Sequence, residues 1–205
     1  MLRGGQVEWL TLQEIGTLER GRRFVHADDR PEGIPAIHYG ELYTYYGIWA
    51  NDVRTHIDSE IQTKLRFAQK NDVIIVGAGE NKEDIGIGVA WLGEYEVAVH
   101  DACYILKHQQ NPKFISYLLR TSGYHRQLKK YVSEGKICSI SAAGVGSIKF
   151  PIPPLKTQEK IVRLLDTFDV LCNGFDEGIP IEIEARHKQY VYYRDKLLTF
   201  KEKTA

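Results

Sequence analysis

The last third of the chain, residues 150–200, constrains the fold more than any other stretch. It opens with a proline-rich segment, residues 150–155. Proline can neither extend a helix nor donate to a strand ladder, so this segment ends the preceding structure. Beyond it, apolar residues recur at steps of three and four and therefore share one face of a helix. That face holds Ile161, Leu164, Leu165, Phe168, Leu171 and Cys172.

A second amphipathic helix is predicted after this one. Gly174 and Gly178 interrupt the first pattern, and Pro180 suits the first turn of a new helix. Its apolar residues fall seven apart, or three apart within a heptad, with an interruption only at Arg186. They are Ile183, Tyr190, Tyr193, Leu197 and Phe200. The two helices could pack on each other and on their own domain, or present a face to another chain, and periodicity does not choose between these readings.

A change in composition predicts a domain boundary between residues 149 and 150. Residues 1–149 alternate strand and helix patterns, whereas residues 150–205 are helical in pattern. A chain of 205 residues exceeds the common size of a single domain, so one domain plus an appendage is expected. Within the first part the sequence predicts strands at 34–38, 73–76, 89–92, 96–99 and 102–107, and helices at 59–69 and 112–131.

Charge is more informative locally than in sum. The formal net charge is zero, which argues mildly against a nucleic-acid binder. Residues 113–136, however, carry six Lys or Arg against one acid, Glu134. Arg120, Lys129 and Lys130 fall on the helix side away from the apolar residues, so we expect them to be exposed. An ordinary solvated helix face is the simpler interpretation, and a phosphate-facing stripe is the functional one. The cations are Lys113, Arg120, Arg126, Lys129, Lys130 and Lys136.

Two further stretches have residue types that suit contact with DNA. The basic loop at residues 19–23 supplies Arg20, Arg22 and Arg23. Residues 43–54 are rich in aromatic and amide side chains and include Tyr45. Within them, Asn51 and Arg54 can each make bidentate contacts to base edges in the major groove.

No complete catalytic or cofactor motif is present. Residues 73–79 resemble the start of a dinucleotide fingerprint, but Lys82 stands where its third glycine belongs, so a tight turn after a buried strand is expected. Residues 111–114 resemble the N-P-P-aromatic loop of adenine methyltransferases, with Lys113 in place of the second proline. Asn111 is better explained as the cap of a helix that begins at Pro112. The E-x-K sequence at residues 134–136 lacks the preceding Pro-Asp element of a nuclease site.

The sequence predicts no metal site and no membrane span. The seven histidines form no H-x-x-x-H pair, and Cys103, Cys138 and Cys172 are too far apart for zinc spacing. Three unpaired cysteines favour a reduced, cytoplasmic protein. No apolar run approaches the roughly 20 residues that a membrane helix needs, and the N-terminus has no apolar signal region.

Three stretches resemble the specificity subunits of type I restriction-modification enzymes. Residues 151–169 and 177–200 are similar to the spacer-helix region of that family. The opening pattern of Val7, Trp9, Leu12, Glu14 and Ile15 is similar to the start of its target recognition domains. Residues 71–75 resemble its G-D-V-L-I strand entry, with asparagine in place of glycine, and both residue types tolerate positive φ.

The resemblance implies a non-catalytic DNA specificity subunit with an α+β fold. Residues 1–149 would form a target recognition domain with a curled mixed sheet and flanking helices. Residues 150–205 would form a coiled-coil-like helical pair that docks methyltransferase subunits, which would supply S-adenosylmethionine and base flipping. A restriction and translocase subunit would join this complex. No cofactor is expected on the chain itself.

Family members usually carry two recognition domains and two helical spacers in about twice this length, so the chain resembles a half-subunit, either natural or a fragment. Antiparallel pairing of helices from two copies would rebuild a reader of a two-part double-stranded DNA site. The expected interface residues are Ile161, Leu165, Phe168, Ile183, Tyr190, Tyr193, Leu197 and Phe200. Two other classes stay open: a stand-alone DNA-modifying enzyme, either adenine methyltransferase or nuclease, and a protein-only helical adaptor.

Overall fold

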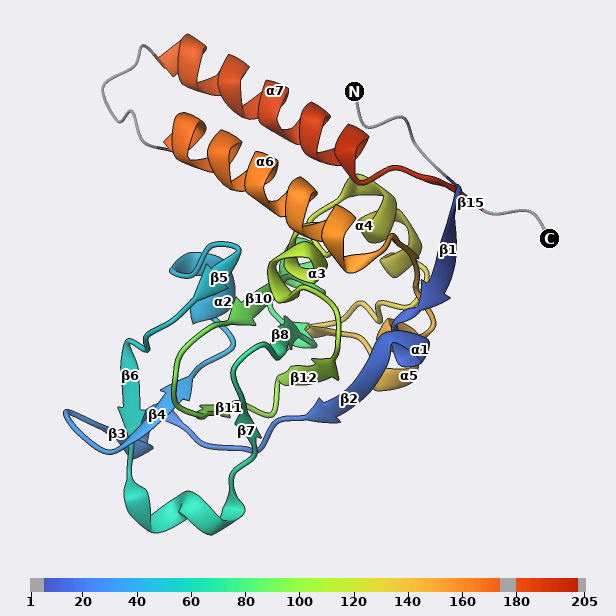
Figure 1. Ribbon diagram of the computed structural model, residues 1–205. Coiled ribbons are helices and arrows are strands. Elements are labelled where there is room, and N and C mark those ends of the chain that lie inside the picture. The colour runs from blue at the N-terminus through green and yellow to red at the C-terminus, as the bar shows by residue number, and fades with distance from the viewer. Residues whose placement is uncertain (1–5, 174–179, 203–205) are drawn as a thin grey trace.

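Hydrophobic strands from the middle of the chain build a central mixed sheet in the computed structural model, which describes residues 6–173 and 180–202 (Figure 1). The wholly buried β8 (Val73–Val76) pairs antiparallel with both β12 (Cys103–His108) and β10 (Gly88–Trp91). The sheet is completed by β2 (Gly16–Arg20), antiparallel to β12, and by β5 (Trp49–Ala50), parallel to β10. The strand order is therefore β2-β12-β8-β10-β5.

A second five-stranded sheet lies below the first in Figure 1. Its order is β3 (Asp29–Arg30), β6 (Thr55–Ile57), β4 (Ile34–Ile37), β11 (Val97–Val99) and β7 (Phe67–Ala68). Only the β4–β11 pairing is parallel. This sheet has a small apolar cluster of its own, made by the buried residues Phe24, Ile34, Ala36, Ile57 and Ala98.

Strand pairing also ties the two ends of the chain together. β1 (Gln6–Thr11) runs antiparallel to β14 (Lys149–Ile152) and parallel to β15 (Lys201–Glu202). A separate two-stranded ladder joins β9 (Ala78–Gly79) to β13 (Cys138–Ser139). Short helical segments connect the strands: α1 (Leu12–Ile15), η1 (His26–Asp28), α2 (Glu41–Thr44), η2 (Ser59–Lys64), η3 (Lys82–Asp84) and α5 (Ala142–Gly146).

The strands predicted at 34–38, 73–76, 89–92, 96–99 and 102–107 are confirmed to within about two residues as β4, β8, β10, β11 and β12. Asn71 has a φ of 76°, so this residue at the strand entry takes the left-handed backbone that asparagine and glycine both tolerate. Its backbone N–H donates to the Trp91 carbonyl at 2.8 Å. The tight turn predicted at residues 77–79 is wrong, because Gly77 follows β8 and residues 78–79 form the short strand β9, which pairs with β13.

Two predicted helices are wrong in extent. The helix predicted at 112–131 is two helices, α3 (Pro112–Leu118) and α4 (Ser122–Leu128). Thr121 separates them, because its hydroxyl donates to the Leu118 carbonyl and accepts from the Tyr124 backbone N–H. The helix predicted at 59–69 is a 3-10 turn, η2, followed by β7, whose pairing with β11 overrides local helix preference.

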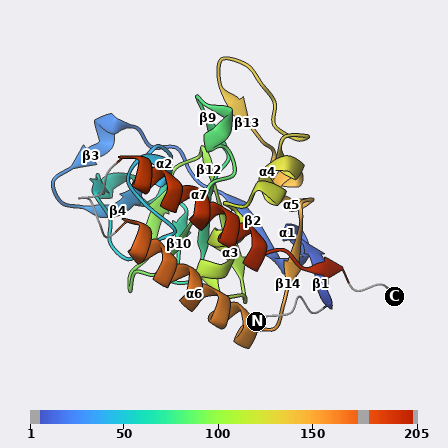
Figure 2. The same ribbon diagram turned by 90° about the horizontal axis from the view of Figure 1, so that it is seen from above.

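The C-terminal helices α6 (Leu155–Asn173) and α7 (Pro180–Leu197) lie side by side over α3 (Figures 1 and 2). The rings of Phe168 and Tyr193 stack between them at a centroid distance of 5.7 Å. Asp166 of α6 accepts from the Tyr117 hydroxyl of α3 at 2.8 Å and from the Lys113 ammonium at 2.5 Å. None of the helices described by the structure is long and apolar enough to cross a membrane.

The main apolar core extends across the 149/150 boundary. Ile161, Val162 and Leu165 of α6, together with Leu198, belong to the same buried cluster as the central sheet. Ile161 and Leu165 are fully buried inside this chain, so their expected place at an interface with another chain is wrong for this structure. The reason is that α3 supplies the apolar surface that their face of the helix requires.

Gln158 is a buried polar residue near the start of α6, and its side chain hydrogen-bonds to two other segments of the chain. Its side-chain oxygen accepts from the Asn111 backbone N–H at 3.0 Å, and its amide donates at 2.8 Å to both the Pro153 carbonyl and the Gln110 side chain. Asn111 in turn caps α3, because its side chain accepts from the Phe114 backbone N–H. The predicted cap is therefore confirmed, and the proline-rich segment, α3 and α6 are joined through one side chain.

We predict that Gln158→Leu lowers the free energy of unfolding by about 1–3 kcal/mol, because it leaves buried backbone groups unpaired. The matched change Lys160→Ala, two residues along on the exposed side of α6, should shift it by no more than about 0.5 kcal/mol. Urea unfolding followed by circular dichroism measures both. Equal stability of the two variants would contradict a stabilising role for the Gln158 hydrogen bonds.

Candidate nucleic-acid interface

Residues 45–54, called the 45–54 loop, lie between α2 and β6 and include the short edge strand β5. Two tyrosine hydroxyls hold the backbone of this segment. The buried Tyr46 accepts from the Arg54 backbone N–H at 3.1 Å. The Tyr95 hydroxyl accepts from the Val53 backbone N–H at 3.2 Å and donates to the Asp52 carboxylate. Burial and the neighbouring carboxylate raise the pKa of Tyr95 to about 12, so it remains a hydroxyl donor at neutral pH. The loop therefore has a fixed shape.

The 45–54 loop presents aromatic, amide and guanidinium groups to solvent. Tyr45 is 59% exposed, and the Arg54 guanidinium lies over its ring at 5.1 Å. Asn51 is exposed on the same loop. Trp49 is 43% exposed, with the Lys113 ammonium 5.1 Å from its ring centroid. The structure thus brings together three residues that the sequence singled out, Tyr45, Asn51 and Arg54, on one rigid support.

Arg120 does not have the exposed position that the sequence predicted. Its guanidinium donates to the Gly47 carbonyl at 2.8 Å and approaches the Gly88 carbonyl at 3.5 Å. Its Nε atom is buried, and burial lowers the pKa of the side chain. The prediction failed because the chain turns at Thr121 and directs Arg120 inward. Arg120 therefore supports the 45–54 loop through the Gly47 carbonyl and is not free to bind a phosphate.

Four of the other cations of this stretch are exposed and are called the basic surface, whereas Lys113 pairs with Asp166. Arg126, Lys129, Lys130 and Lys136 are all exposed, as predicted for the two lysines. The one acid of the stretch, Glu134, forms an ion pair with Lys82. Arg126 and Lys129 also line a cavity of about 370 Å³ together with Arg120, Ser122 and His125. Arg120 thus lies between the 45–54 loop and this surface of α4.

The three N-terminal arginines lie on a different part of the molecule. Arg20 ends β2, and its Nε atom donates to the Asp101 carbonyl at 2.7 Å. It lines a cavity of about 500 Å³ with Tyr104 and residues of the β13–α5 segment. Arg22 and Arg23 are exposed in the loop after β2. These arginines and the 45–54 loop therefore form two separate candidate surfaces.

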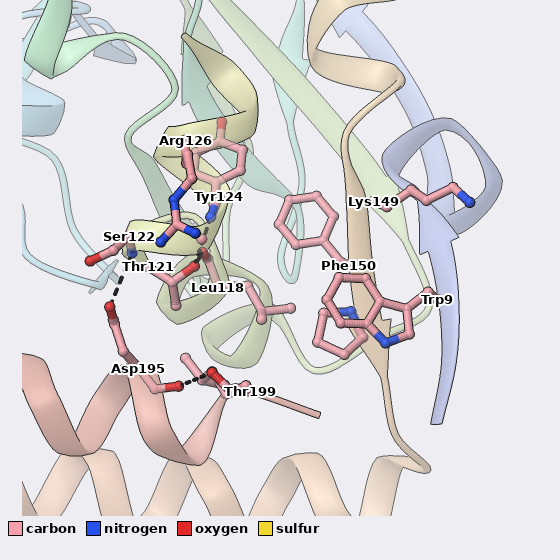
Figure 3. Close-up of a pocket in the computed structure, with 13 residues that line it drawn as sticks. Trp9, Leu118, Thr121, Ser122, Tyr124, Arg126, Lys149, Phe150, Asp195 and Thr199 are labelled. Carbon is pink, nitrogen blue, oxygen red and sulfur yellow. Dashed lines mark hydrogen bonds between the residues drawn. The ribbon is translucent and has the colours of Figure 1, made fainter. Parts of the chain in front are cut away.

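A third cavity, of about 410 Å³, lies between α4, β1, β14 and the end of α7 (Figure 3). Asp195 accepts from the Ser122 backbone N–H at 3.3 Å, which ties α7 to α4. The Nε1 atom of Trp9 is buried without a partner among the described residues. Sequence reasoning missed this cavity, although Trp9 belongs to the opening motif and Phe150 to the proline-rich segment. The cavity forms where the opening motif, the proline-rich segment and the second helix converge.

The apolar seam predicted on the last helix is turned largely inward. Tyr190 is buried, and Leu197 and Phe200 pack against the main core. The side chain of Ile183 lies outside the residues whose side chains the structure describes. Tyr193 is the seam residue that stays exposed, by 38%. Leu155, Leu164 and Tyr192 are further exposed apolar side chains among the described residues of the two helices, exposed by 51%, 44% and 59%.

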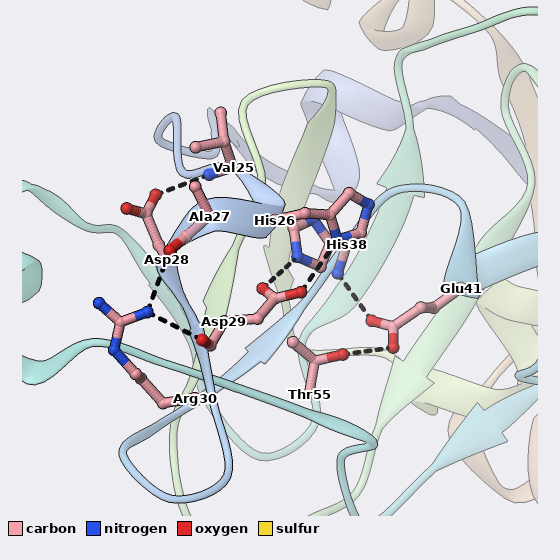
Figure 4. A network of polar contacts seen from close by, with 9 residues as sticks. All are labelled: Val25, His26, Ala27, Asp28, Asp29, Arg30, His38, Glu41 and Thr55. Carbon is pink, nitrogen blue, oxygen red and sulfur yellow. Dashed lines mark hydrogen bonds and ion pairs between the residues drawn. The ribbon is translucent and has the colours of Figure 1, made fainter.

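One group among the described residues has the side chains and proximity to hold a metal ion, at a place that the sequence did not single out. It consists of His26, Asp29 and His38, whose candidate ligand atoms all lie within 4.8 Å of one another (Figure 4). Helical spacing of the histidines could not reveal this group, because it is assembled from η1, β3 and the end of β4.

Comparison with known proteins gives one consistent result. A family model described as the type I restriction modification DNA specificity domain matches residues 5–185. The specificity subunit of the Escherichia coli type I restriction enzyme EcoR124I/EcoR124II is 31% identical over 212 residues, covering 96% of this chain and 49% of that protein. A putative type I specificity subunit of Haemophilus influenzae is 30% identical over 149 residues, covering 72% of this chain and 37% of that protein.

Solved structures show the same fold at low sequence identity. The HsdS subunit of Thermoanaerobacter tengcongensis aligns with a TM-score of 0.58 at 16% identity, over 97% of this chain and 46% of that chain. The type I restriction-modification S subunit of M. genitalium aligns with a TM-score of 0.55 at 16% identity, over 85% of this chain and 42% of that chain. The chain spans about half the length, or less, of the relatives it matches.

We predict that Arg120→Ala loosens the 45–54 loop, because the Gly47 carbonyl loses its charged donor. The free energy of unfolding should fall by about 1.5–3 kcal/mol, the usual value for a hydrogen bond to a charged group. Amide exchange in residues 45–54, followed by mass spectrometry, should become faster. The control Lys129→Ala changes an exposed cation nearby and should leave both measurements unchanged. Unchanged exchange in Arg120→Ala would contradict the supporting role.

Proposed function

Since this chain belongs to the type I restriction-modification DNA specificity family, we propose that it is a non-catalytic subunit that binds one half of a two-part DNA target. The observation that carries this proposal is the family match over residues 5–185. The match includes both the 45–54 loop and the first of the C-terminal helices. In this role the chain works in the cytoplasm, on double-stranded DNA.

Base reading is assigned to the 45–54 loop. Asn51 and Arg54 carry the donor and acceptor groups that make bidentate contacts with adenine and guanine edges. Tyr45 holds the Arg54 guanidinium over its ring, which limits the orientations of that side chain. Because the hydroxyls of the buried Tyr46 and the exposed Tyr95 hold the backbone, little ordering entropy is lost when the loop meets a groove. Such preorganisation favours discrimination between base pairs.

Phosphate contacts are assigned to the exposed cations of the basic surface and of the β2 loop. The residues are Arg126, Lys129, Lys130 and Lys136, together with Arg20, Arg22 and Arg23. Arg120 is reassigned to positioning the 45–54 loop, because its guanidinium is engaged by the Gly47 carbonyl. The formal net charge of zero means that attraction to DNA depends on these local surfaces rather than on the whole chain.

The chain is proposed to act through partners. Residues 1–149 would be the recognition domain and residues 150–205 the helical spacer that docks methyltransferase subunits. A restriction and translocase subunit would join this complex. The tight attachment of α6 to α3 through Asp166 supports this arrangement, because a partner bound to the helices would then be rigidly placed relative to the 45–54 loop.

A stand-alone DNA-modifying enzyme is less well supported. Asn111, which could belong to a methyltransferase loop, uses its side chain to cap α3 and its backbone N–H to bind Gln158. A protein-only helical adaptor would have no use for the exposed groups of the 45–54 loop. The two alternatives differ in their expected behaviour: the enzyme would transfer methyl groups without partners, and the adaptor would be indifferent to DNA.

We predict that changes at the two kinds of DNA contact are separable in the assembled complex. Lys129→Ala with Lys130→Ala should weaken binding about equally on all sequences and reduce the salt slope by about 1 for each phosphate that is no longer neutralised. Arg54→Ala or Asn51→Ala should cost about 1–3 kcal/mol on the true target and relax the preference at one base pair.

Fluorescence anisotropy at several salt concentrations measures the first effect, and mapping of methylated sites measures the second. Lys64→Ala, which removes an exposed cation on η2, is the control and should behave as the unchanged chain. The chain purified without its partners should transfer no methyl group. Methyl transfer by the chain alone would favour the enzyme, and an unaltered methylation map in Asn51→Ala and Arg54→Ala would remove the base-reading assignment.

The second half of the target is proposed to be read by a second copy, paired through the helices in antiparallel fashion. The structure describes exposed apolar side chains on both helices, Leu164 on α6 and Tyr192 on α7, which a twofold partner would cover. A two-part site with inverted halves would follow, because each copy presents the same surface to DNA. Its spacing would be set by the length of the helices.

We predict that Leu164→Glu with Tyr192→Glu converts a dimer to monomers, because burying two charges at an apolar contact is strongly unfavourable. The control Gln62→Glu with Thr63→Glu adds the same charge to the exposed η2 and should remain dimeric. Light scattering at several concentrations distinguishes these outcomes. A monomeric unchanged chain, or an asymmetric target in the assembled enzyme, would rule out the homodimer.

A further inference from the structure

Two histidines and one aspartate converge at the edge of the second sheet, on η1, β3 and the end of β4 (Figure 4). Asp29 contacts both rings: one carboxylate oxygen lies 2.9 Å from His26 Nδ1, and the other lies 3.0 Å from His38 Nε2. The two imidazole rings stack at a centroid distance of 4.2 Å. Both imidazole nitrogens therefore face the Asp29 carboxylate, one on each of its oxygens.

The backbone around this group is held in place by its neighbours. Arg30 donates to the carbonyls of Ala27 and Asp29, at 3.0 and 2.9 Å, and to the Asp58 carboxylate at 2.7 Å. The Asp28 carboxylate accepts from the Val25 backbone N–H at 2.8 Å, which fixes the turn that carries His26. Two of the candidate ligands, His26 and Asp29, thus start from a turn that hydrogen bonds hold in place.

On the sheet side, His38 is only 6% exposed. Its backbone N–H donates to Glu41 at 2.8 Å, and the edge of the Phe24 ring packs on its imidazole at a centroid distance of 4.8 Å. His26 is the opposite case, since its side chain is 84% exposed. One ligand is therefore sheltered, and the other lies at the surface, where an ion can reach it from solvent.

We propose that His26, Asp29 and His38 form a binding site for a divalent transition metal, with Zn²⁺ as the best match. Imidazole nitrogen with carboxylate oxygen is a donor set that suits zinc and its neighbours, whereas magnesium and calcium prefer oxygen ligands alone. Zinc–ligand bonds of about 2.0–2.2 Å place tetrahedral ligands roughly 3.4 Å apart. The ligand atoms already lie within 4.8 Å of one another.

Neighbouring groups leave the ligand set at three protein side chains. The Glu41 carboxylate is engaged by the His38 backbone N–H and by the Thr55 hydroxyl at 2.7 Å. His100 stands near His38, with ring centroids 5.8 Å apart, but its Nδ1 atom accepts from the Ala102 backbone N–H at 3.1 Å. A fourth position is therefore left to water, as in zinc sites with three protein ligands.

A metal at this place has a structural purpose. The second sheet's own apolar cluster contains five buried residues: Phe24, Ile34, Ala36, Ile57 and Ala98. Small apolar cores are commonly reinforced by a metal or a disulfide. An ion held by His26, Asp29 and His38 would link the edge strand β3 to the end of β4. It would also restrict the motion of the loop after β2, which carries Arg22 and Arg23.

The test titrates Zn²⁺ into chelator-treated full-length chain by isothermal calorimetry. We expect one Zn²⁺ per chain, little competition from Mg²⁺, and weaker binding as the pH falls through the imidazole range, because the ligands must lose their protons. Co²⁺ in place of Zn²⁺ should give the visible absorption of a low-symmetry four-coordinate site. Amide exchange in residues 24–30 should slow when Zn²⁺ is added.

His26→Gln is the decisive variant, because its exposed position leaves the fold intact and glutamine can still donate to Asp29. Loss of a group that only orients a metal ligand costs about 10–100-fold in metal affinity, so loss of this ligand itself should cost more than about 100-fold. Asp29→Asn and His38→Gln should behave likewise, with circular dichroism to confirm folding. His187→Gln, an exposed histidine on α7, is the control and should bind as the unchanged chain.

Absence of stoichiometric Zn²⁺ binding by the unchanged chain would overturn the proposal. So would binding that His26→Gln leaves intact, since the ion would then lie elsewhere. Weak binding at several sites, reduced equally by His26→Gln and His187→Gln, would identify surface chelation and would also refute the site. DNA binding does not enter any of these measurements, so they stand apart from the proposed specificity role.

Discussion

The contact between α3 and α6 is the constraint on which the rest of the structure depends. Asp166 accepts from Tyr117 and Lys113, and the apolar residues beside it belong to the same core as the central sheet. Burial and the carboxylate together raise the pKa of the Tyr117 hydroxyl, which keeps it a donor. Because the helices share a core with the strands, they cannot swing as an independent arm. Their direction is fixed relative to every loop that the central sheet carries.

The same rigid contact also fixes the position of the 45–54 loop relative to the C-terminal helices. Arg120 comes from the turn after α3 and donates to Gly47, so the same helix that anchors α6 also supports the loop. A partner docked on the helices and a base pair under Asn51 or Arg54 would be related by one stiff element. Sequence discrimination needs such stiffness, since a mobile support would average the contacts with correct and incorrect bases.

The second sheet is stabilised in a different way from the central sheet. It lies away from α3 and α6, has only a small apolar cluster, and carries the arginine-bearing loop after β2. Polar contacts dominate its edge, where Arg30 bridges two backbone carbonyls and Asp58, and where Asp29 lies between two imidazoles. An edge held in this way is stabilised by a few directional contacts rather than by a large apolar core.

The sequence by itself determined the features that depend on local pattern. Helical periodicity located α6 and α7, the Asn111-Pro112 pair located the start of α3, and the motifs at both ends of the chain identified the family. Only the tertiary structure decided which faces are covered. It turned Arg120 inward, buried Ile161 and Leu165, converted part of a predicted helix into β7, and assembled His26, Asp29 and His38. The physical reason is that burial and strand register depend on partners distant in sequence, whereas periodicity reports only that a face needs a partner.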